Sequence, residues 1–307
     1  MLLACAGFSL FLLPFSLATY QVNKWRSASI ICMLVFGSAT IIAWIFYEAM
    51  VAPNPFLPWK YLKDRTIAGS CLLACVLFIA FYCWDSYFFS YLQVVYNLSV
   101  KDAGYVSNIY SIGSCFWAVV IGYAIRKTNH FKWVALVFLP INMLGTGLMI
   151  HFRQPGQGVG YVIMCQIFIA FAGGALVIAE EIAVLAPVPH ENIASASALQ
   201  YLSSGIGGAI GLTISGAIWT NNLPAKLNLY LPADLQDQAL TIYGDLVTQL
   251  SYPVGRPARD AIIRAYGDTQ KLMCIAATAV QVLAIIGVVI WKDINLKDRK
   301  QVKGLVV

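Results

Sequence analysis

The chain has 307 residues, of which 60% are hydrophobic and only 11% are charged, and its mean hydropathy is +0.73. Soluble globular domains carry about 25% charged residues, so this composition excludes an ordinary soluble domain and predicts a polytopic membrane protein. The formal charge of +6 fits a basic cytoplasmic surface, and no nucleic-acid partner is predicted.

Apolar segments long enough to cross a bilayer, which takes about 20 helical residues, recur along the whole chain. They cover residues 1–19, 27–50, 66–91, 105–125, 133–151, 159–185, 196–220 and 271–291. The first could instead be a signal peptide, but it lacks a basic N-terminal region and a small-residue cleavage site, so a membrane helix is favoured. The predicted fold is an all-α membrane protein with eight transmembrane helices that lie in the lipid bilayer.

Lysine and arginine are distributed unequally between alternate short loops. One set is Lys60, Lys63, Arg65, Arg126, Lys127, Lys132, Lys292, Lys297, Arg299, Lys300 and Lys303, and the other is only Lys24, Arg26, Lys101 and Arg153. Cytoplasmic loops are enriched in cations, so the loop 51–65 and the tail 292–307 are predicted to be cytoplasmic and the long loop 221–270 external. Within that loop, residues 232–250 could form an amphipathic helix, and a second helix is predicted to begin at Pro257 and to stop at Gly267.

No enzyme signature is present. The three histidines lie far apart in the sequence, and there is neither a zinc-protease motif nor a phosphate-binding loop. Cys71 and Cys75 could share a helix face, but no histidine or carboxylate lies near them in sequence. The sequence therefore predicts no enzymatic activity, no cofactor and no metal site, and any transport would be driven by an ion gradient.

The segment 196–220 is rich in small residues. Ser204 and Gly208 are four residues apart, as are Gly207 and Gly211. Small residues at this spacing allow two membrane helices to approach closely. The pattern predicts tight helix packing, and it would also suit helices that slide during transport.

Acidic residues inside the apolar segments stand out, because each costs roughly 2.5–3.5 kcal/mol on insertion scales. Asp85 lies in the outer part of the third segment and is followed by an aromatic cluster, while Glu180 and Glu181 lie in the inner part of the sixth. Such acids are candidates for a functional site, and the alternative is a structural partner or a group that reaches the interface.

Several stretches closely resemble the fungal siderophore–iron transporters. They are WDSYFFSYLQVV, YVSNIYSIGSCFWAVVIGYAIR, GLMIHFRQPG, GYVIMCQIFIAFAGGALVI, SSGIGGAIGLTISGAIWTNNLP and YGDLVTQLSYPVGRPARDAIIRAYGDTQK, which begin at residues 84, 105, 147, 160, 203 and 243. That family consists of fourteen-helix, proton-coupled members of the major facilitator superfamily, and the resemblance extends over essentially the whole chain.

The family plan is six helices, two linker helices and six more helices. By this resemblance residues 1–50 are the linker pair, residues 66–291 are the C-terminal six-helix half, and the N-terminal half is a missing partner. The implied function is a share in proton-coupled uptake of ferric siderophore by alternating access, at the plasma membrane or an endosomal membrane. A drug–proton antiporter of the same superfamily and a transport-inactive truncated membrane protein remain open as alternatives.

In this superfamily the first and fourth helices of each half line the central cavity. The resemblance places Asp85 and Glu180 on those helices, so both are proton-coupling candidates. The candidates for contact with the substrate are Trp84, Tyr87, Phe88, Tyr91 and Gln93, together with Tyr252 and Tyr266 of the external loop.

The basic turn after the segment 105–125 departs from the family pattern. Where the family reads I-R-x-T-G-R-F-K-W, this chain has Asn129 and His130 in place of Gly and Arg. Asparagine tolerates the left-handed conformation, so the turn is predicted to survive while one cation is weakened. In the sixth segment Glu180 matches the family acid, whereas Glu181 replaces a glutamine.

Overall fold

The computed structural model describes residues 2–18, 21, 24–51 and 59–298, and this part of the chain contains helices and no strand. The tail cations Arg299, Lys300 and Lys303, and residues 52–58 of the predicted cytoplasmic loop, lie outside the described residues.

Long helices account for nearly all of the described chain. Their bounds are α1 Leu2–Leu17, α2 Ala28–Met50, α4 Arg65–Asp85, α5 Phe88–Tyr96, α6 Val100–Ser107, α7 Ile109–Thr128, α8 Lys132–Phe152, α9 Val159–Leu185, α10 Ile193–Tyr230, α13 Pro257–Val280 and α14 Val282–Val289. The short elements are α3 Trp59–Leu62, α11 Ala239–Gly244, α12 Leu246–Ser251 and the 3₁₀ turns η2 Lys24–Arg26, η3 His190–Asn192, η4 Ala233–Gln238 and η5 Leu296–Asp298.

Seven helical segments of the described chain are long and apolar enough to cross a membrane. The predicted first helix forms α1, which has 16 residues and is shorter than a typical span. The chain is therefore a multi-pass membrane protein, and the predicted total of eight crossings remains a prediction.

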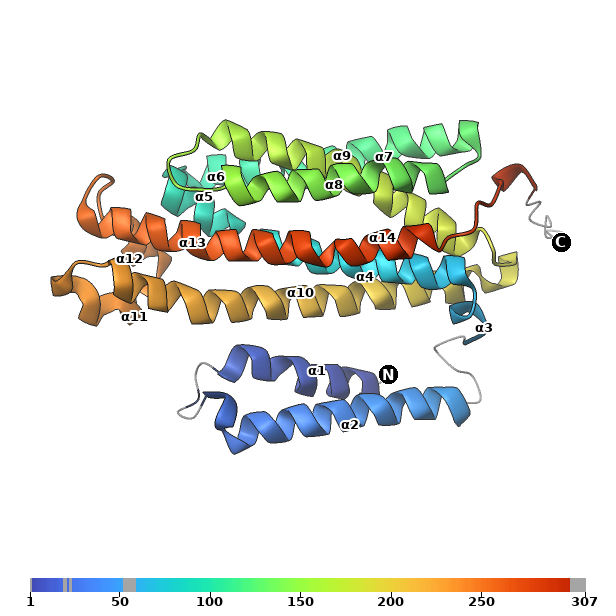
Figure 1. Ribbon diagram of the computed structural model, residues 1–307, viewed down its shortest axis with the longest axis horizontal. Helices are drawn as coiled ribbons and strands as arrows, with labels where there is room; N and C mark the ends of the chain where they lie inside the picture. The colour runs from blue at the N-terminus through green and yellow to red at the C-terminus, as the bar shows by residue number, and fades with distance from the viewer. Residues whose placement is uncertain (1, 19–20, 22–23, 52–58, 299–307) are drawn as a thin grey trace.

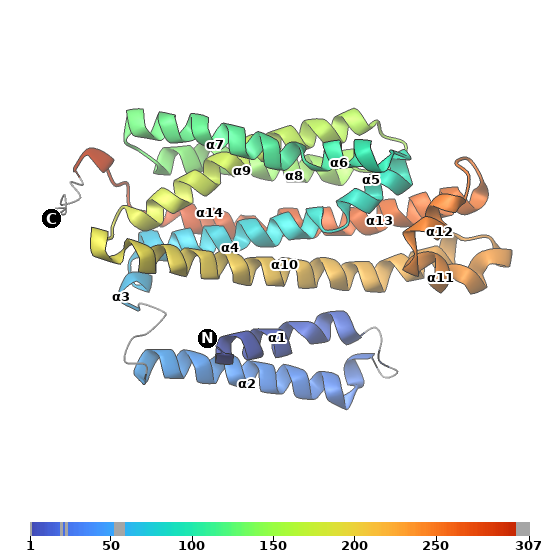
Figure 2. The ribbon, with the colours of Figure 1, turned by 180° about the vertical axis from the view of Figure 1, so that it is seen from behind.

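Helix α4 lies at the centre of the bundle (Figures 1 and 2). On one side of it lie α7, α8 and α9, on the other lies α10, and the α13–α14 pair runs alongside α4 between α8 and α10. The α1–α2 hairpin is outermost and packs beside α10, where Ala4 and Trp44 join a buried cluster with Ile67, Val184 and Leu199. Helices α2, α14 and the start of α4 reach the same end of the bundle, while α11 and α12 cover the opposite end.

The small residues of α10 pack tightly against another helix, as the sequence predicted, and that helix is α4. A methyl group on Gly207 would lie 2.8 Å from the Cα and carbonyl carbon of Cys75, and one on Gly211 would lie 2.7 Å from the Ile79 carbonyl oxygen. The two backbones are therefore in direct contact. Farther along the same contact, Ser215 Oγ donates to Ser86 Oγ over 3.0 Å.

Side-chain caps define several helix starts. Asp64 accepts a hydrogen bond from the Thr66 amide at 2.8 Å and Ser99 accepts one from the Asp102 amide at 3.1 Å. Asp245 caps α12 by accepting from the Thr248 hydroxyl and amide and from the Val247 amide. These hydrogen bonds hold the pKa of Asp245 below its ordinary value.

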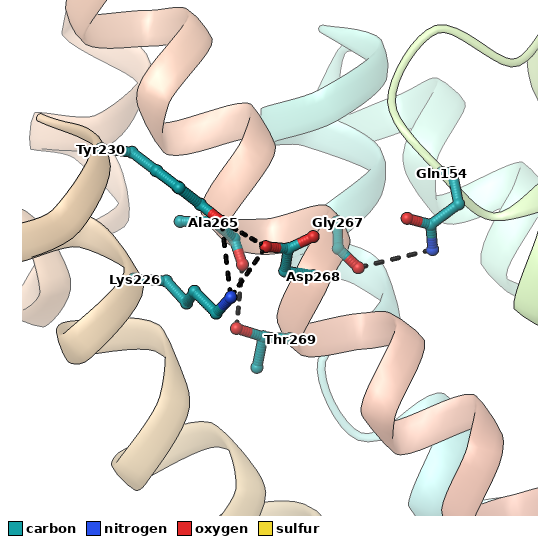
Figure 3. A network of polar contacts seen from close by, with 7 residues as sticks. All are labelled: Gln154, Lys226, Tyr230, Ala265, Gly267, Asp268 and Thr269. Atoms are coloured by element: carbon teal, nitrogen blue, oxygen red, sulfur yellow. Dashed lines mark hydrogen bonds and ion pairs between the residues drawn. The ribbon is translucent and has the colours of Figure 1, made fainter.

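The predicted helix end at Gly267 is wrong. Helix α13 begins at Pro257, as predicted, but continues through Gly267 to Val280. Gly267 serves a close approach instead, because a methyl group there would lie 2.6 Å from Pro155 Cγ, and its carbonyl accepts a hydrogen bond from Gln154 at 3.4 Å (Figure 3). The loop predicted over 221–270 is also shortened from its other end, since α10 extends to Tyr230.

The amphipathic helix expected over 232–250 is divided into three short elements, η4, α11 and α12. The last division falls at Asp245, which takes an extended conformation and caps α12 instead of continuing α11. The cap over this end of the bundle is thus folded and compact.

The turn after α7 survives, as predicted. Asn129 has φ 60 and ends α7 in the left-handed conformation. His130, which replaces a family arginine, lies 3.2 Å from Asp293 beyond α14. The carbonyl of Asn129 also accepts from the Leu296 amide at 3.1 Å, so this turn holds the segment that follows α14.

Candidate functional site

A cavity of about 130 Å³ lies inside the bundle between α4, α7, α8, α9 and the junction of α13 with α14. Its lining consists of Leu77, Phe78, Ala80, Phe81, Trp84, Tyr110, Asn142, Thr146, Ile169, Gly173, Val177 and Gln281. None of these side chains is charged.

The floor of the cavity is polar and buried. Asn142 Nδ2 donates to Gln281 Oε1 over 3.1 Å, and Gln281 Nε2 donates to Thr146 Oγ1 over 3.0 Å. The Thr146 hydroxyl in turn donates to backbone carbonyls of its own helix, one of them that of Asn142 at 3.1 Å. All three side chains are at most 5% exposed, and they join α8 to the break between α13 and α14. Sequence reasoning missed them, although polar residues in apolar segments are a usable signal.

Another part of the lining is aromatic. The Tyr110 ring lies 5.1 Å from Phe81 and 5.7 Å from Trp84, and Phe81 and Trp84 are 5.5 Å apart in an edge-to-face arrangement. Trp84 is buried, whereas Phe81 and Tyr110 are partly exposed. The three rings therefore form one edge-to-face aromatic cluster in the lining.

Asp85 is the last residue of α4 and follows the cavity-lining Trp84 directly. Its side chain is partly buried and, within the described residues, its carboxylate accepts no hydrogen bond. The cation that acts on it electrostatically is Arg153, which comes from the loop after α8. A carboxylate at a helix end, near a cation but not bonded to it, can gain or lose a proton without breaking a salt bridge.

Arg153 is fully buried, although the sequence analysis placed it in an external loop. Its Nη1 donates to the Trp84 carbonyl over 2.6 Å, and its guanidinium lies 4.3 Å from the Phe88 ring centre and 5.1 Å from that of Tyr91. It therefore caps a carbonyl that the break between α4 and α5 leaves free. Among the described residues, its Nε and Nη2 have no hydrogen-bond partner. Nothing in the local sequence signals this long-range role.

Glu180 is buried between α9 and α10. Its Oε1 accepts from Gln200 Nε2 over 3.4 Å, and no hydrogen-bond donor in the described part of the chain reaches its Oε2. Glu181, the next residue, is partly exposed. Glu180 and Asp85 do not contact each other, but Tyr110 of the cavity lies within electrostatic range of both.

The seven substrate-contact candidates fall into different settings. Trp84 lines the cavity, Tyr87 is partly exposed and stacks on Trp219 with ring centres 4.0 Å apart, and Tyr252 is partly exposed. Phe88, Tyr91, Gln93 and Tyr266 are buried, with Tyr266 donating to Gln249 Oε1 over 2.6 Å. Together with Trp84, five of the seven are therefore buried in this conformation.

A second polar cluster joins the C-terminal end of α10 to α13 (Figure 3). Lys226 Nζ lies 3.0 Å from Asp268 Oδ2, and the Tyr230 hydroxyl donates to the same oxygen over 2.6 Å. The Arg264 guanidinium lies 4.3 Å from the Tyr230 ring centre. The cluster holds the C-terminal end of α10 beside α13, and none of its residues belongs to the cavity lining.

Comparison with known proteins gives the family. The sequence profile of the Major Facilitator Superfamily matches residues 1–212. The chain belongs to this superfamily. Its members are transporters and not enzymes, which agrees with the absence of an enzyme signature. The predicted transporter fold is also confirmed.

Curated relatives match the chain along nearly all of its length. It is 51% identical over 307 residues to MFS siderochrome iron transporter 1 of Ajellomyces capsulatus, covering 100% of this chain and 52% of the relative. It is 44% identical over 305 residues to siderophore iron transporter mirB of Emericella nidulans, covering 99% and 50%. The chain spans about half the length of these relatives. These names do not favour the drug–proton antiporter alternative.

The fold is similar to the crystal structure of a bacterial homolog to the human lysosomal transporter Spinster in an inward-facing and occupied conformation. The TM-score is 0.51 at 13% sequence identity, and the match covers 96% of this chain and 68% of that chain. At this identity the likeness concerns the fold alone.

Proposed function

We propose that this chain forms the C-terminal part of a ferric-siderophore carrier that works by proton-coupled alternating access. The observation that carries the proposal is the identity of 51% over the whole chain with a named siderochrome iron transporter. Residues 1–50 would be two linker helices, 66–291 the C-terminal half with the external loop 221–270, and 51–65 and 292–307 cytoplasmic. The partner is a six-helix N-terminal half, and the carrier resides in the plasma membrane or an endosomal membrane.

The position of Asp85 supports a role in proton coupling. It lies at the end of α4, beside the cavity and within range of Arg153. When the carboxylate is ionised, its attraction to the guanidinium favours the present arrangement of the break between α4 and α5. Protonation removes that attraction, so α5 and the cap above it can shift relative to α4. Glu180, at the inner part of α9, would be the second proton site.

The substrate-contact candidates then fall into groups according to the stage of transport at which each can contact the ferric siderophore. Tyr87 and Tyr252 are partly exposed and can contact it first, and Trp84 lines the cavity. Phe88, Tyr91, Gln93 and Tyr266 become available only if the outer elements move.

Asp85→Asn tests the coupling. The chain is fused to the N-terminal six-helix half of the Ajellomyces capsulatus relative, and uptake of radioactive iron as ferric siderophore is measured against external pH in an uptake-deficient fungus. Coupling energies between linked sites of about 1–3 kcal/mol predict a loss of roughly fivefold to 150-fold at acidic pH and a flat pH profile.

Glu181→Gln, which restores the family residue, is the matched control and should retain the normal profile. The chain without the added half should not restore uptake, because alternating access needs two halves that move about a central site. An Asp85→Asn carrier that reaches the surface and keeps the normal pH dependence would remove Asp85 from the mechanism.

A further inference from the structure

Three interruptions of the membrane helices border the same cavity. Trp84 precedes the break between α4 and α5, Tyr110 follows the break between α6 and α7 at Asn108, and Gln281 is itself the break between α13 and α14. Irregular backbone at membrane depth is tolerated where it lines a cavity, and interrupted helices point to binding sites in transporters. The three breaks therefore indicate a ligand-binding site at this cavity.

The cavity floor has hydrogen-bonding capacity that the protein does not use. Within the described residues, Asn142 Oδ1 receives no donor, while Asn142 Nδ2 and Gln281 Nε2 each use one of their two hydrogens. A group that fits this floor must offer one donor and one acceptor close together. An amide offers both, and its apolar flank suits the aromatic wall of Phe81, Trp84 and Tyr110.

The charge and the size of the cavity restrict the range of possible ligands further. No lining residue is charged, so an ion would be bound without a counter-charge, which is unfavourable in a buried site. The volume of about 130 Å³ is near that of a cavity that holds one benzene, and below the roughly 300–1,000 Å³ of pockets for complete drug-sized ligands. The space fits one group of a larger molecule, or one small molecule.

We propose that this cavity is a binding subsite for a single neutral group of the amide type, held by Asn142 and Gln281 against Trp84 and Tyr110. Thr146 is a positioning residue, because it accepts from Gln281 and fixes that side chain. The assignment of the group to one arm of the transported chelate rests on the proposed function, whereas the subsite itself does not.

The test uses the 307-residue chain in lipid nanodiscs and the probe 2,2,2-trifluoro-N-methylacetamide, followed by fluorine NMR. Trifluoroacetate is the charged counterpart and should not bind. Asn142→Leu and Thr146→Val should each weaken probe binding roughly threefold to tenfold, the usual effect of losing one net hydrogen bond. Their matched controls, Asn222→Leu on α10 and Thr278→Val on α13, replace residues outside the lining and should leave binding unchanged.

A steric variant keeps the test decisive if a polar variant unfolds. A methyl group at Gly173 would lie 2.9 Å from the Tyr110 hydroxyl, so Gly173→Ala should displace that ring and reduce binding, while Gly160→Ala on the same helix meets nothing. Thermal unfolding of each variant shows that the fold is retained. Probe binding no stronger than that of trifluoroacetate, or unchanged in a folded Gly173→Ala chain, would overturn the proposal.

Competition distinguishes the two sources of the group. Displacement of the probe by ferrichrome, a neutral ferric chelate with amide groups, would assign the subsite to an arm of the chelate. Saturable probe binding without displacement would assign it to a separate small amide. A carrier that binds the probe normally but never takes up ferric siderophore would count against the transport function and leave the subsite standing.

Discussion

Gly207→Ala is the sharpest perturbation of the contact between α4 and α10. The added methyl group would lie 2.8 Å from the Cα and carbonyl carbon of Cys75 and closer still to the carbonyl oxygen. Ordinary van der Waals contact begins at about 3.4 Å, and the obstructing atoms belong to backbone that cannot rotate away. The two helices must therefore separate locally.

The magnitude follows from a comparison with Gly205→Ala on the same helix, where nothing lies within 4 Å of the added methyl group. Both variants gain the same helix propensity, about 1 kcal/mol in a helix interior, so this contribution cancels between them. Overpacking costs about 1–3 kcal/mol. The free energy of unfolding of Gly207→Ala should lie below that of Gly205→Ala by about this amount.

The assay is reversible unfolding of the purified chain in mixed micelles by increasing amounts of SDS, followed by tryptophan fluorescence. Gly205→Ala should be as stable as the wild type or slightly more stable. If the two variants have the same midpoint and slope, the backbone contact between α4 and α10 is not the packing constraint inferred from the structure.

Asn129→Val should destabilise the turn after α7 by about 1–2 kcal/mol, because a β-branched residue is strained at φ 60, whereas Asn129→Gly should cost little; equal SDS midpoints for the two would contradict this. The cap of α12 should loosen on acidification, because the pKa of Asp245 is held low in the folded chain. The stabilisation that its carboxylate gives is present above the unfolded pKa of about 3.9 and is lost as pH falls through the folded pKa. The rate of amide exchange over 245–251, corrected for its intrinsic pH dependence, should rise in that pH range. It should not rise in the Asp245→Ser variant, because serine keeps an uncharged cap. Gln238→Cys, in a chain whose exposed native cysteines are replaced by alanine, should react with an impermeant thiol reagent in intact cells; reaction only after permeabilisation would reverse the predicted topology.

Local sequence properties predicted most of the helices. An apolar segment of sufficient length forms a helix in a bilayer, because a helix satisfies the hydrogen bonds of its backbone polar groups within the segment. The close contact of α10 was also predictable, because the small residues at Gly207 and Gly211 recur every four positions on one helix face. The left-handed Asn129 followed from the intrinsic tolerance of asparagine for that conformation.

Local sequence context gives the wrong role for a residue that serves a distant partner. Gly267 looked like a helix end but is the surface on which Pro155 packs, and Arg153 looked like a loop cation but caps the Trp84 carbonyl. In both cases the partner is far away in sequence, so no local propensity could reveal it.

The sequence by itself identified the apolar segments that can cross a membrane and the acids Asp85 and Glu180 within them, because hydrophobicity and charge belong to each segment separately. Only the tertiary structure decided which polar groups share a cavity. Asn142 and Gln281 are 139 positions apart and bond at 3.1 Å because α8 packs beside the break between α13 and α14. That juxtaposition depends on how whole helices pack, and helix packing is a collective property that no short stretch of sequence contains.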